Sequence, residues 1–523
     1  MSLGARATAV VLALTQFTVS WAQAPSSVLP PTATTQLPTL GSGGEMNSNA
    51  ERRLGERIAR EIYRDPDYID DPVLVDYVQG IWQPLLVAAR ARGDLSEELD
   101  QRFAWEVMLG RDRSINAFAL PGGYLGLHLG LVGVVSSRDE LASVLAHELS
   151  HVTQRHISRI MTKQSQQAPW LLGAMILGAL AASKSPDAAN AVLVGSQAVA
   201  AQTQLNFSRD MEREADRVGY GILMQAGFDP QAFVTMFDKL GQSSRLNDSG
   251  AFPYLRSHPL TTERLADMQS RQPPGVRAPD VAAQSPSHAM LSARARVVSN
   301  SSVDALRAWL AQAPKSAGDP SPVTAQAAAL YGAALAASKL RDPASAASHV
   351  RQLGSLPITE PVAARLVKLL QAELALAQGD AAAAVALLTS IGPIKAEVSA
   401  PWKTDRPWVM LSAQAWIAAG QPALATERLQ QWVVTYPRDA QAWSLLSSAY
   451  GAQGKALRSV RASAEARVAE LDYEAALDRF NAAQALVRES AVRASDADHI
   501  EASIVDMRRR EVQSLLKEQA LER

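Results

Sequence analysis

The 523 residues are enough for two or three domains, and 47% hydrophobic with 20% charged residues is an ordinary globular composition. The formal net charge of −1 gives no reason to expect a nucleic-acid partner. Cysteine is absent, which excludes disulfides, thiolate metal sites, cysteine nucleophiles and a lipoprotein anchor, and leaves histidine, glutamate and aspartate as the available metal ligands.

The first residues predict a secretory signal peptide over residues 1–22. Arg6 precedes an apolar run, and small residues stand at Ser20 and Ala22, as they do before a cleavage site. The alternative is an uncleaved membrane anchor, for which the run is short. Residues 23–46 are rich in Pro, Thr, Ser and Gly and offer almost nothing to bury, so we expect a flexible linker there.

Residues 47–271 are expected to form the first folded domain, which begins with two helices. Ser48 and Glu51 have the spacing of a capping box, and apolar residues follow them at helical spacing. A second helix is predicted over residues 72–91, where the apolar residues recur with the same period.

Strands are predicted next, because the apolar residues begin to alternate at Phe103. The first strand is expected over residues 103–109 and the second over residues 115–119. The sequence Pro121-Gly122-Gly123 then predicts a turn before residues 124–129. The most informative helix of the chain follows these strands.

That helix is expected over residues 139–161, with Ser137 and Glu140 as a capping box, and it carries His147-Glu148-x-x-His151. Two histidines four residues apart share a helix face and can bind one metal ion, while the glutamate between them reaches a water molecule there. The pattern arises by chance in such a chain with a probability on the order of 1%. It therefore predicts a zinc hydrolase.

A catalytic zinc takes three protein ligands, so a third must come from elsewhere in the chain. In a helix over residues 208–216, Glu212 and Asp216 lie one turn apart. Glu212 then binds the metal, and Asp216 accepts a hydrogen bond from a ligand histidine and fixes its tautomer. The alternative is an ordinary solvated charged helix.

His258, which precedes Pro259, is the second candidate. A histidine on such a loop can donate a hydrogen bond to the oxyanion of the tetrahedral intermediate, or occupy the open zinc position and hold the enzyme inactive. The alternative is an exposed loop histidine. His156 follows His151 by five residues, so we expect its side chain to point away from the ligands.

Two apolar stretches, residues 168–182 and 188–201, are shorter than the roughly 20 residues of a spanning helix and are expected to be buried or docked at a surface. Residues 272–288 contain four prolines and predict a linker. Residues 289–523 are alanine-rich and helical, and Trp443, Leu446 and Tyr450 fall where tetratricopeptide repeats have large residues. About four degenerate repeats are expected, with a plain helical bundle as the alternative.

The HExxH motif, Glu212-x-x-Ala215-Asp216 and residues 116–123 together resemble the membrane-linked metallopeptidase family that includes the CAAX prenyl proteases and HtpX. Within it, the chain resembles the BepA-like β-barrel assembly-enhancing proteases, which join this domain to tetratricopeptide repeats. The resemblance implies a mainly α protein: an α+β, gluzincin-like domain with a small sheet, one Zn²⁺ per chain, and an all-α repeat solenoid.

The resemblance also implies a substrate-binding edge strand, formed by Asn116, Ala117 and Phe118, that pairs with the peptide. The alternative is that Asn116 and the glycines Gly122 and Gly123 only shape a turn. In the implied mechanism Glu148 moves the proton of the attacking water, and His258 or a nearby donor stabilises the oxyanion.

The implied function is a periplasmic zinc endopeptidase that degrades misfolded or stalled outer-membrane proteins, with repeats that recruit the substrate or the assembly machinery. A peripheral membrane contact is a further expectation. The rival hypothesis is a chaperone or adaptor for outer-membrane protein assembly, in which His258 keeps a latent protease site shut.

Overall fold

The computed structural model describes residues 46–164, 208–246, 253–272, 285–314, 321–394, 405–490 and 496–521. Residues 44–523 form one compact unit, to which every contact reported below belongs. The expected signal peptide, the linker up to residue 45 and both apolar stretches, 168–182 and 188–201, lie outside the described residues. Among the helices that are described, none is both long and apolar enough to span a bilayer.

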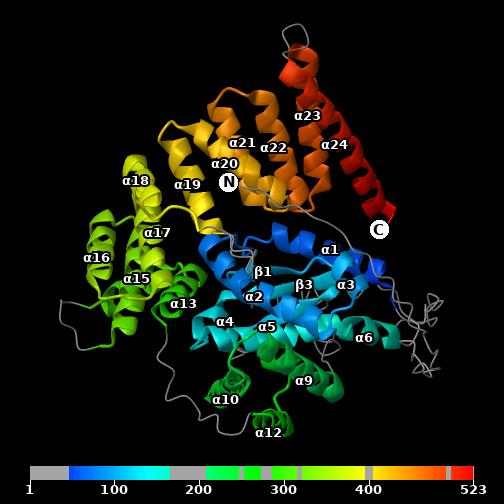
Figure 1. Ribbon diagram of the computed structural model, residues 1–523, viewed down its shortest axis with the longest axis vertical. Helices are drawn as coiled ribbons and strands as arrows, with labels where there is room; N and C mark the ends of the chain where they lie inside the picture. The colour runs from blue at the N-terminus through cyan, green and yellow to red at the C-terminus, as the bar shows by residue number, and fades with distance from the viewer. Residues whose placement is uncertain are drawn as a thin grey trace, which may run out of the picture. The chain divides into compact units, whose positions relative to one another are not determined.

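A three-stranded sheet lies at the centre of the N-terminal part (Figure 1), with the strand order β1-β3-β2. Strand β3 (Tyr124–His128) pairs in parallel with β1 (Glu106–Gly110) and antiparallel with β2 (Ala117–Leu120). Strand β2 therefore has one edge without a neighbouring strand of this sheet. The predicted turn before β3 is confirmed: η1 (Pro121–Gly123) holds two glycines at φ 71° and 84°, a region that favours glycine.

The first strand begins later than expected. Residues 103–105 are not part of it, because Phe103 ends helix α3 (Glu97–Arg102) and Trp105 has a φ of 52°, which no β-strand tolerates. The Trp105 side chain instead lies in the core, and its carbonyl accepts a hydrogen bond from Trp82 Nε1. The alternation of apolar residues therefore marked burial here rather than pairing in the sheet.

The helices of this part largely follow the expected positions. Helix α1 (Ser48–Arg64) is capped by Asn47, whose side chain accepts from Ala50 N, so the predicted Ser48 cap was one residue late. Two further helices precede the helix that carries the HExxH motif: α2 (Pro72–Arg92) and, after strand β3, α4 (Leu129–Val134).

Helix α5 (Arg138–Thr153) carries the HExxH motif and is buried on every side from Glu140 onward. It packs against β2, α9 (Arg209–Gln225) and α10 (Gln231–Leu246). Figure 1 shows α5 between the sheet and these two helices. The expected helix over residues 139–161 was wrong in its length. Arg155, at φ 53°, interrupts it before α6 (His156–Gln164).

The C-terminal part of the described chain is helical, which confirms the predicted fold class. Four consecutive helix pairs share a three-residue turn whose middle residue has a positive φ: Arg341, Gly379, Gly420 and Gly454. The helices are α13 (Pro286–Ser299), α14 (Val303–Gln312), α15 (Val323–Lys339), α16 (Pro343–Ser355), α17 (Pro361–Ala377), α18 (Ala381–Ile391), α19 (Arg406–Ala418), α20 (Pro422–Thr435), α21 (Ala440–Ala452), α22 (Ala456–Ala469), α23 (Tyr473–Ser490) and α24 (Asp496–Leu521). A turn that recurs in this way is typical of a helical repeat region.

Helix α13 starts inside the range 272–288 that was expected to be a linker, because Ser285 caps it and Pro286 occupies its first position. It packs on α4. His288 Nε2 donates to Val135 O at 3.0 Å, and Ser292 donates to Gly133 O at 2.9 Å. The first helix of the repeat region is thus part of the same hydrophobic core as the motif helix.

Two neighbouring aspartates, Asp70 and Asp71, add ionic contacts between the two parts. Arg406 of α19 donates to Asp70 at 2.7 Å, and Arg294 of α13 donates to Asp71 at 2.9 Å. Both arginines are buried, so each needs its carboxylate partner. The repeat helices are therefore held to the first domain by directional contacts at the start of α2.

Stability should depend on pH through His288. Burial is the main cause that lowers the pKa of His288 below its usual value, and the ring accepts at Nδ1 from Tyr77 Oη, 2.8 Å away. A histidine with a lowered folded-state pKa contributes stability at high pH, and that contribution is lost as pH falls below about 6.5. We expect the melting temperature of the unchanged protein to exceed that of His288→Gln at pH 7.5, with a difference that shrinks by pH 5.5. A difference that is constant over this range contradicts the prediction.

Candidate metal centre

Helix α5 directs both motif histidines toward one point. His147 Nε2 and His151 Nε2 are 3.0 Å apart, and both rings are completely buried. Their positions one turn apart on a helix explain this convergence, as the motif predicted. Glu148 lies beside them and is also buried.

Helix α9 supplies the carboxylates. It starts at its expected place because Ser208 caps it, with the hydroxyl accepting from Met211 N. Gly219 lets α9 approach closely, since a Cβ atom there would lie 3.0 Å from the Ala146 carbonyl oxygen of α5. Glu212 and Asp216 are only 1% exposed, so the alternative of a solvated charged helix is wrong.

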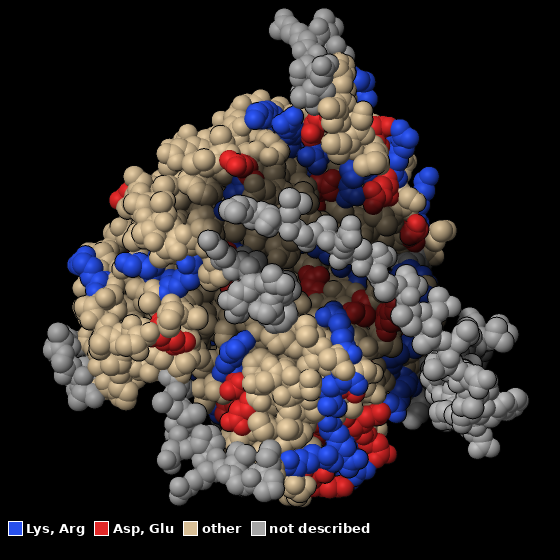
Figure 2. Space-filling view, in the orientation of Figure 1, with Lys and Arg blue, Asp and Glu red and all other residues tan. Residues whose placement is uncertain are grey.

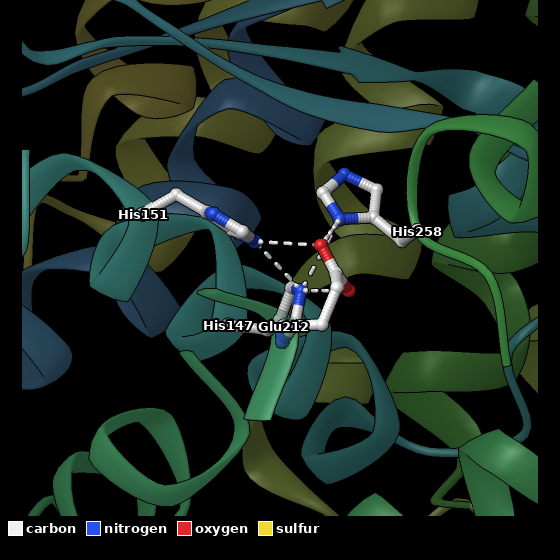
Figure 3. Close-up of side chains that lie close together, drawn as sticks. All are labelled: His147, His151, Glu212 and His258. Carbon is white, nitrogen blue, oxygen red and sulfur yellow. Dashed lines mark hydrogen bonds and ion pairs between the residues drawn. The ribbon is translucent and has the colours of Figure 1, made fainter. Parts of the chain in front are cut away.

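The four side chains His147, His151, Glu212 and His258 form a cluster whose potential ligand atoms all lie within 4.8 Å of one another (Figure 3). Glu212 Oε1 lies 3.5 Å from His151 Nε2 and 3.0 Å from His258 Nδ1. Ligand atoms about 2.0–2.1 Å from a tetrahedral zinc ion are roughly 3.3 Å apart. The spacing and the chemistry of the donors therefore fit zinc.

His258 contributes a donor atom to this cluster, so it is not an exposed loop histidine. Its Nδ1 atom is 3.3 Å from His147 Nε2, and its Nε2 atom is 3.4 Å from Glu148 Oε1. The ring is held by Tyr254, which stacks on it with centroids 4.7 Å apart and an interplanar angle of 29°. Tyr254 was missed in the sequence, because a lone tyrosine on a short helix, α11 (Pro253–Ser257), carries no pattern.

Asp216 contacts the far side of His147, with Oδ1 2.9 Å from His147 Nδ1. Arg264 of α12 (Thr262–Ser270) holds this carboxylate with two hydrogen bonds of 2.7 Å. Burial by itself raises the pKa of Asp216, but hydrogen bonds from Arg264 and His147 bring it below its usual value. Asp216 is therefore ionised and able to accept the His147 Nδ1 proton.

Arg264 is the second residue that the sequence did not reveal. Besides Asp216, it contacts Glu212 Oε2 at 2.8 Å and donates to Pro259 O at 2.9 Å. One buried guanidinium thus joins the two carboxylates of α9 to the His258 loop. Its position six residues after His258 gave only a faint signal. A charged residue near the start of an amphipathic helix is ordinarily exposed, so the sequence did not indicate that Arg264 is buried.

The expectation for His156 was wrong. Because the helix breaks at Arg155, the His156 ring turns back, and its Nδ1 atom lies 2.9 Å from His151 Nδ1. His156 Nε2 lies 3.1 Å from Glu214 Oε2. Burial is the main cause that lowers the pKa of His156 to about 4, which makes its ring neutral at ordinary pH.

The expected substrate strand borders the site through its backbone. Ala119 N in β2 donates to Glu148 Oε2 at 2.9 Å. Burial raises the pKa of Glu148, although the neighbouring His258 and His147 partly oppose this. Of the three predicted substrate residues, Ala117 and Phe118 lie in β2 and Asn116 directly precedes it, with its carbonyl accepting from His128 N.

A buried HExxH helix, a carboxylate from a second helix and an edge strand beside the glutamate define a zinc metallopeptidase. Comparison with known proteins leads to the same class. Residues 87–272 match the model of Peptidase family M48. The chain therefore belongs to this family, and the predicted resemblance to the β-barrel assembly-enhancing proteases is confirmed by its relatives.

Three relatives show how far the similarity extends. The chain is 33% identical to a putative beta-barrel assembly-enhancing protease of Vibrio cholerae, over 57% of this chain and 59% of that protein. It is 30% identical to the beta-barrel assembly-enhancing protease of Escherichia coli, over 82% of this chain and 83% of that protein. It is 27% identical to the mitochondrial metalloendopeptidase OMA1 of Saccharomyces cerevisiae, over 38% and 55%. Similarity to the bacterial proteins thus continues into the repeat region.

Replacing Arg264 should damage both stability and metal binding. Arg264→Gln leaves Asp216 and Glu212 buried without their cation, and breaking such a pair costs about 3–5 kcal/mol of the free energy of unfolding. The affinity for zinc should fall about 10–100-fold, because His147 loses a fixed acceptor. Thermal unfolding and a zinc titration measure the two effects.

The matched control is Arg213→Gln, which removes an ion pair between the same two helices, Arg213 with Glu263, at the surface. Figure 2 shows basic and acidic side chains side by side in this region of the surface. Exposed pairs of this kind contribute little. If Arg213→Gln lowers the melting temperature as much as Arg264→Gln does, burial is not what makes Arg264 important.

Proposed function

We propose that His147, His151 and Glu212 hold the catalytic zinc ion of an endopeptidase in which Glu148 is the general base. The observation that carries this proposal is the buried donor cluster beside an edge strand whose backbone contacts Glu148. Zinc, when bound, lowers the pKa of a water molecule and polarises the carbonyl of the scissile peptide bond. In our proposal Glu148 accepts the proton of that water and passes it to the leaving amine.

The outer edge of β2 is the proposed binding site for an extended substrate. An edge strand offers backbone donors and acceptors, so a peptide can bind as a further strand largely independently of its sequence. Ala117 and Phe118 would pair with the peptide, and Asn116 would mark the point where the peptide enters. Glu148, which contacts the next residue, Ala119, would then lie directly beside the scissile bond.

We further propose that His258 keeps the resting site shut. With His258 the cluster has four protein donors, whereas a catalytic zinc site has three and keeps one position open. The hydrogen bond from Arg264 to Pro259 O and the stacking of Tyr254 favour this closed arrangement. Activity would require the loop that carries His258 to move away, after which the same ring could serve as an oxyanion donor.

The names of the bacterial relatives support a substrate class: we propose that the chain acts in the periplasm on misfolded or stalled outer-membrane β-barrel proteins. A cleaved signal peptide over residues 1–22 and a peripheral membrane contact belong to this proposal. The metallopeptidase domain, residues 47–271, would cleave the substrate. Residues 289–523, as tetratricopeptide-like repeats, would recruit it or dock on the assembly machinery.

The second candidate is a chaperone or adaptor for outer-membrane protein assembly with a latent protease site. The fourth donor, His258, favours it, since a closed site is compatible with long periods without cleavage. The two candidates differ in whether Glu148 is needed. An adaptor works without it, whereas a protease does not.

Glu148→Gln should abolish proteolysis and retain zinc, because the amide keeps the shape of the side chain and cannot accept a proton. The purified mature chain and the variant, with matched zinc content, are incubated with an unfolded outer-membrane β-barrel protein. We expect the cleavage rate to fall by about 10²–10⁴-fold, the usual contribution of a general base. If the variant still restores outer-membrane assembly in cells that lack the protein, the adaptor function is the correct one.

His258→Ala should increase the cleavage rate several-fold if the ring blocks the zinc position. Removal of the ring leaves three protein donors and an open position for water. Arg256→Ala, an exposed residue of helix α11 two positions before His258, is the control and should cleave at the rate of the unchanged chain. A slower rate for His258→Ala would show instead that the histidine stabilises the oxyanion and does not inhibit.

A further inference from the structure

We propose that His156 is a positioning residue of the metal centre: it accepts the Nδ1 proton of His151, and Glu214 holds it in the tautomer that can accept. The inference rests on the proposed role of His151 as a zinc ligand. The three groups form a continuous row, with His151 Nδ1 2.9 Å from His156 Nδ1 and His156 Nε2 3.1 Å from Glu214 Oε2.

The directions of the hydrogen bonds follow from the partners. A carboxylate oxygen only accepts, so the Nε2 atom of His156 that faces Glu214 carries a hydrogen. Two nitrogens that face each other cannot both donate, so the Nδ1 atom of His156 accepts where His151 donates. His151 must present a bare Nε2 atom to a metal ion, so its hydrogen is on Nδ1 and points at His156.

The opposite tautomers are incompatible with metal binding. If His156 donated from Nδ1, His151 would have to accept there and would carry its hydrogen on Nε2, where the metal binds. Glu214 therefore acts on the metal centre through His156, by selecting which of its nitrogens is protonated. Arg159 fixes Glu214 in turn, with a distance of 2.9 Å from Arg159 Nη1 to Glu214 Oε2.

The row repeats the arrangement on the other ligand histidine. His147 Nδ1 lies 2.9 Å from Asp216, which Arg264 holds, and His151 Nδ1 faces His156, whose partner Glu214 is held by Arg159. The first row ends in a buried ion pair, whereas the Arg159 and Glu214 side chains are 40% and 38% exposed. Both ligand rings thus have a fixed acceptor, although only the acceptor of His147 carries a charge.

The break between α5 and α6 is what makes this contact possible. In an unbroken helix, a residue five positions after His151 lies about 140° around the axis and cannot reach it. Arg155 adopts φ 53° at the break and donates to Glu51 Oε2 at 3.0 Å, so a contact with α1 stabilises the unusual conformation. The strained backbone at Arg155 therefore positions the His156 ring against His151.

Substitutions that keep one nitrogen at a time test the inference in the full-length protein. His156→Asn retains an acceptor near Nδ1, His156→Gln retains an amide near Nε2 only, and His156→Phe keeps a ring without nitrogen. Zinc affinity is measured by competition with a chromophoric chelator, and the absorption spectrum of the cobalt-substituted protein reports the ligand geometry. Thermal unfolding of the metal-free variants checks that each one folds.

We expect zinc binding by His156→Phe and His156→Gln to be about 10–100-fold weaker, with altered cobalt spectra, and His156→Asn to bind nearly as tightly as the unchanged chain. Glu214→Ala should weaken binding in the same direction. Ser150→Ala is the control, since that buried hydroxyl donates only to Ala146 O of its own helix. Zinc affinity equal to that of the unchanged protein in both His156→Phe and His156→Gln overturns the inference.

The proposed ligand assignment can fail separately. His151→Ala should lose tight zinc binding, and retention of tight binding would contradict the assignment itself. If His151→Ala loses zinc while the His156 variants do not, the metal centre stands and His156 has no part in it. If His156→Phe does not fold, the comparison of His156→Asn with His156→Gln decides whether His156 positions His151. Equal zinc affinities for these two variants overturn the inference.

Discussion

The close approach of helix α9 to helix α5 is the constraint on which the metal centre depends. Gly219 permits it, because a Cβ atom there would lie 3.0 Å from the Ala146 backbone, and the two helices would have to separate by a few tenths of an ångström to relieve the contact. The approach brings two carboxylates of α9 into a buried region already occupied by two histidines of α5. Burial of these carboxylates costs solvation energy, which Arg264 offsets in part, and which a bound divalent cation would offset further. The metal centre is therefore also part of what holds the two helices together.

The repeat region is bound to the first domain far more firmly than a linker would hold it. Its first helix, α13, lies in the same core as α4, and Asp70 and Asp71 each pair with a buried arginine of a different repeat helix. A partner that binds the repeats is thereby kept in a fixed relation to the α2 end of the metallopeptidase domain. This arrangement supports a recruiting role for the repeats, since a protein held there needs no further ordering of the two domains.

Patterns in the sequence were sufficient where a few adjacent residues decide the geometry. The HExxH motif needs only one turn of helix α5 to bring His147 and His151 together. One turn of helix α9 likewise puts Glu212 and Asp216 on one face. The turn at Gly122 and Gly123 was predictable for a related reason, because the required backbone angles suit glycine. The sequence predicted the start of the first strand too early and the end of α5 too late, whereas the structure has them at Glu106 and Thr153. Apolar spacing reports burial and cannot show a single residue with positive φ, such as Trp105 or Arg155.

By itself the sequence determined the class of protein, the chemistry of the ligands and the helical nature of the C-terminal half, since each of these depends on residue type and local spacing. Only the tertiary structure decided which distant side chains complete the site. Arg264 and Tyr254 act through contacts across the fold, and His156 reaches His151 only because the helix is broken between them. The physical reason is that side chains form hydrogen bonds only at heavy-atom separations of about 2.7–3.2 Å and in suitable directions, so these roles exist only in the geometry that the packed helices impose.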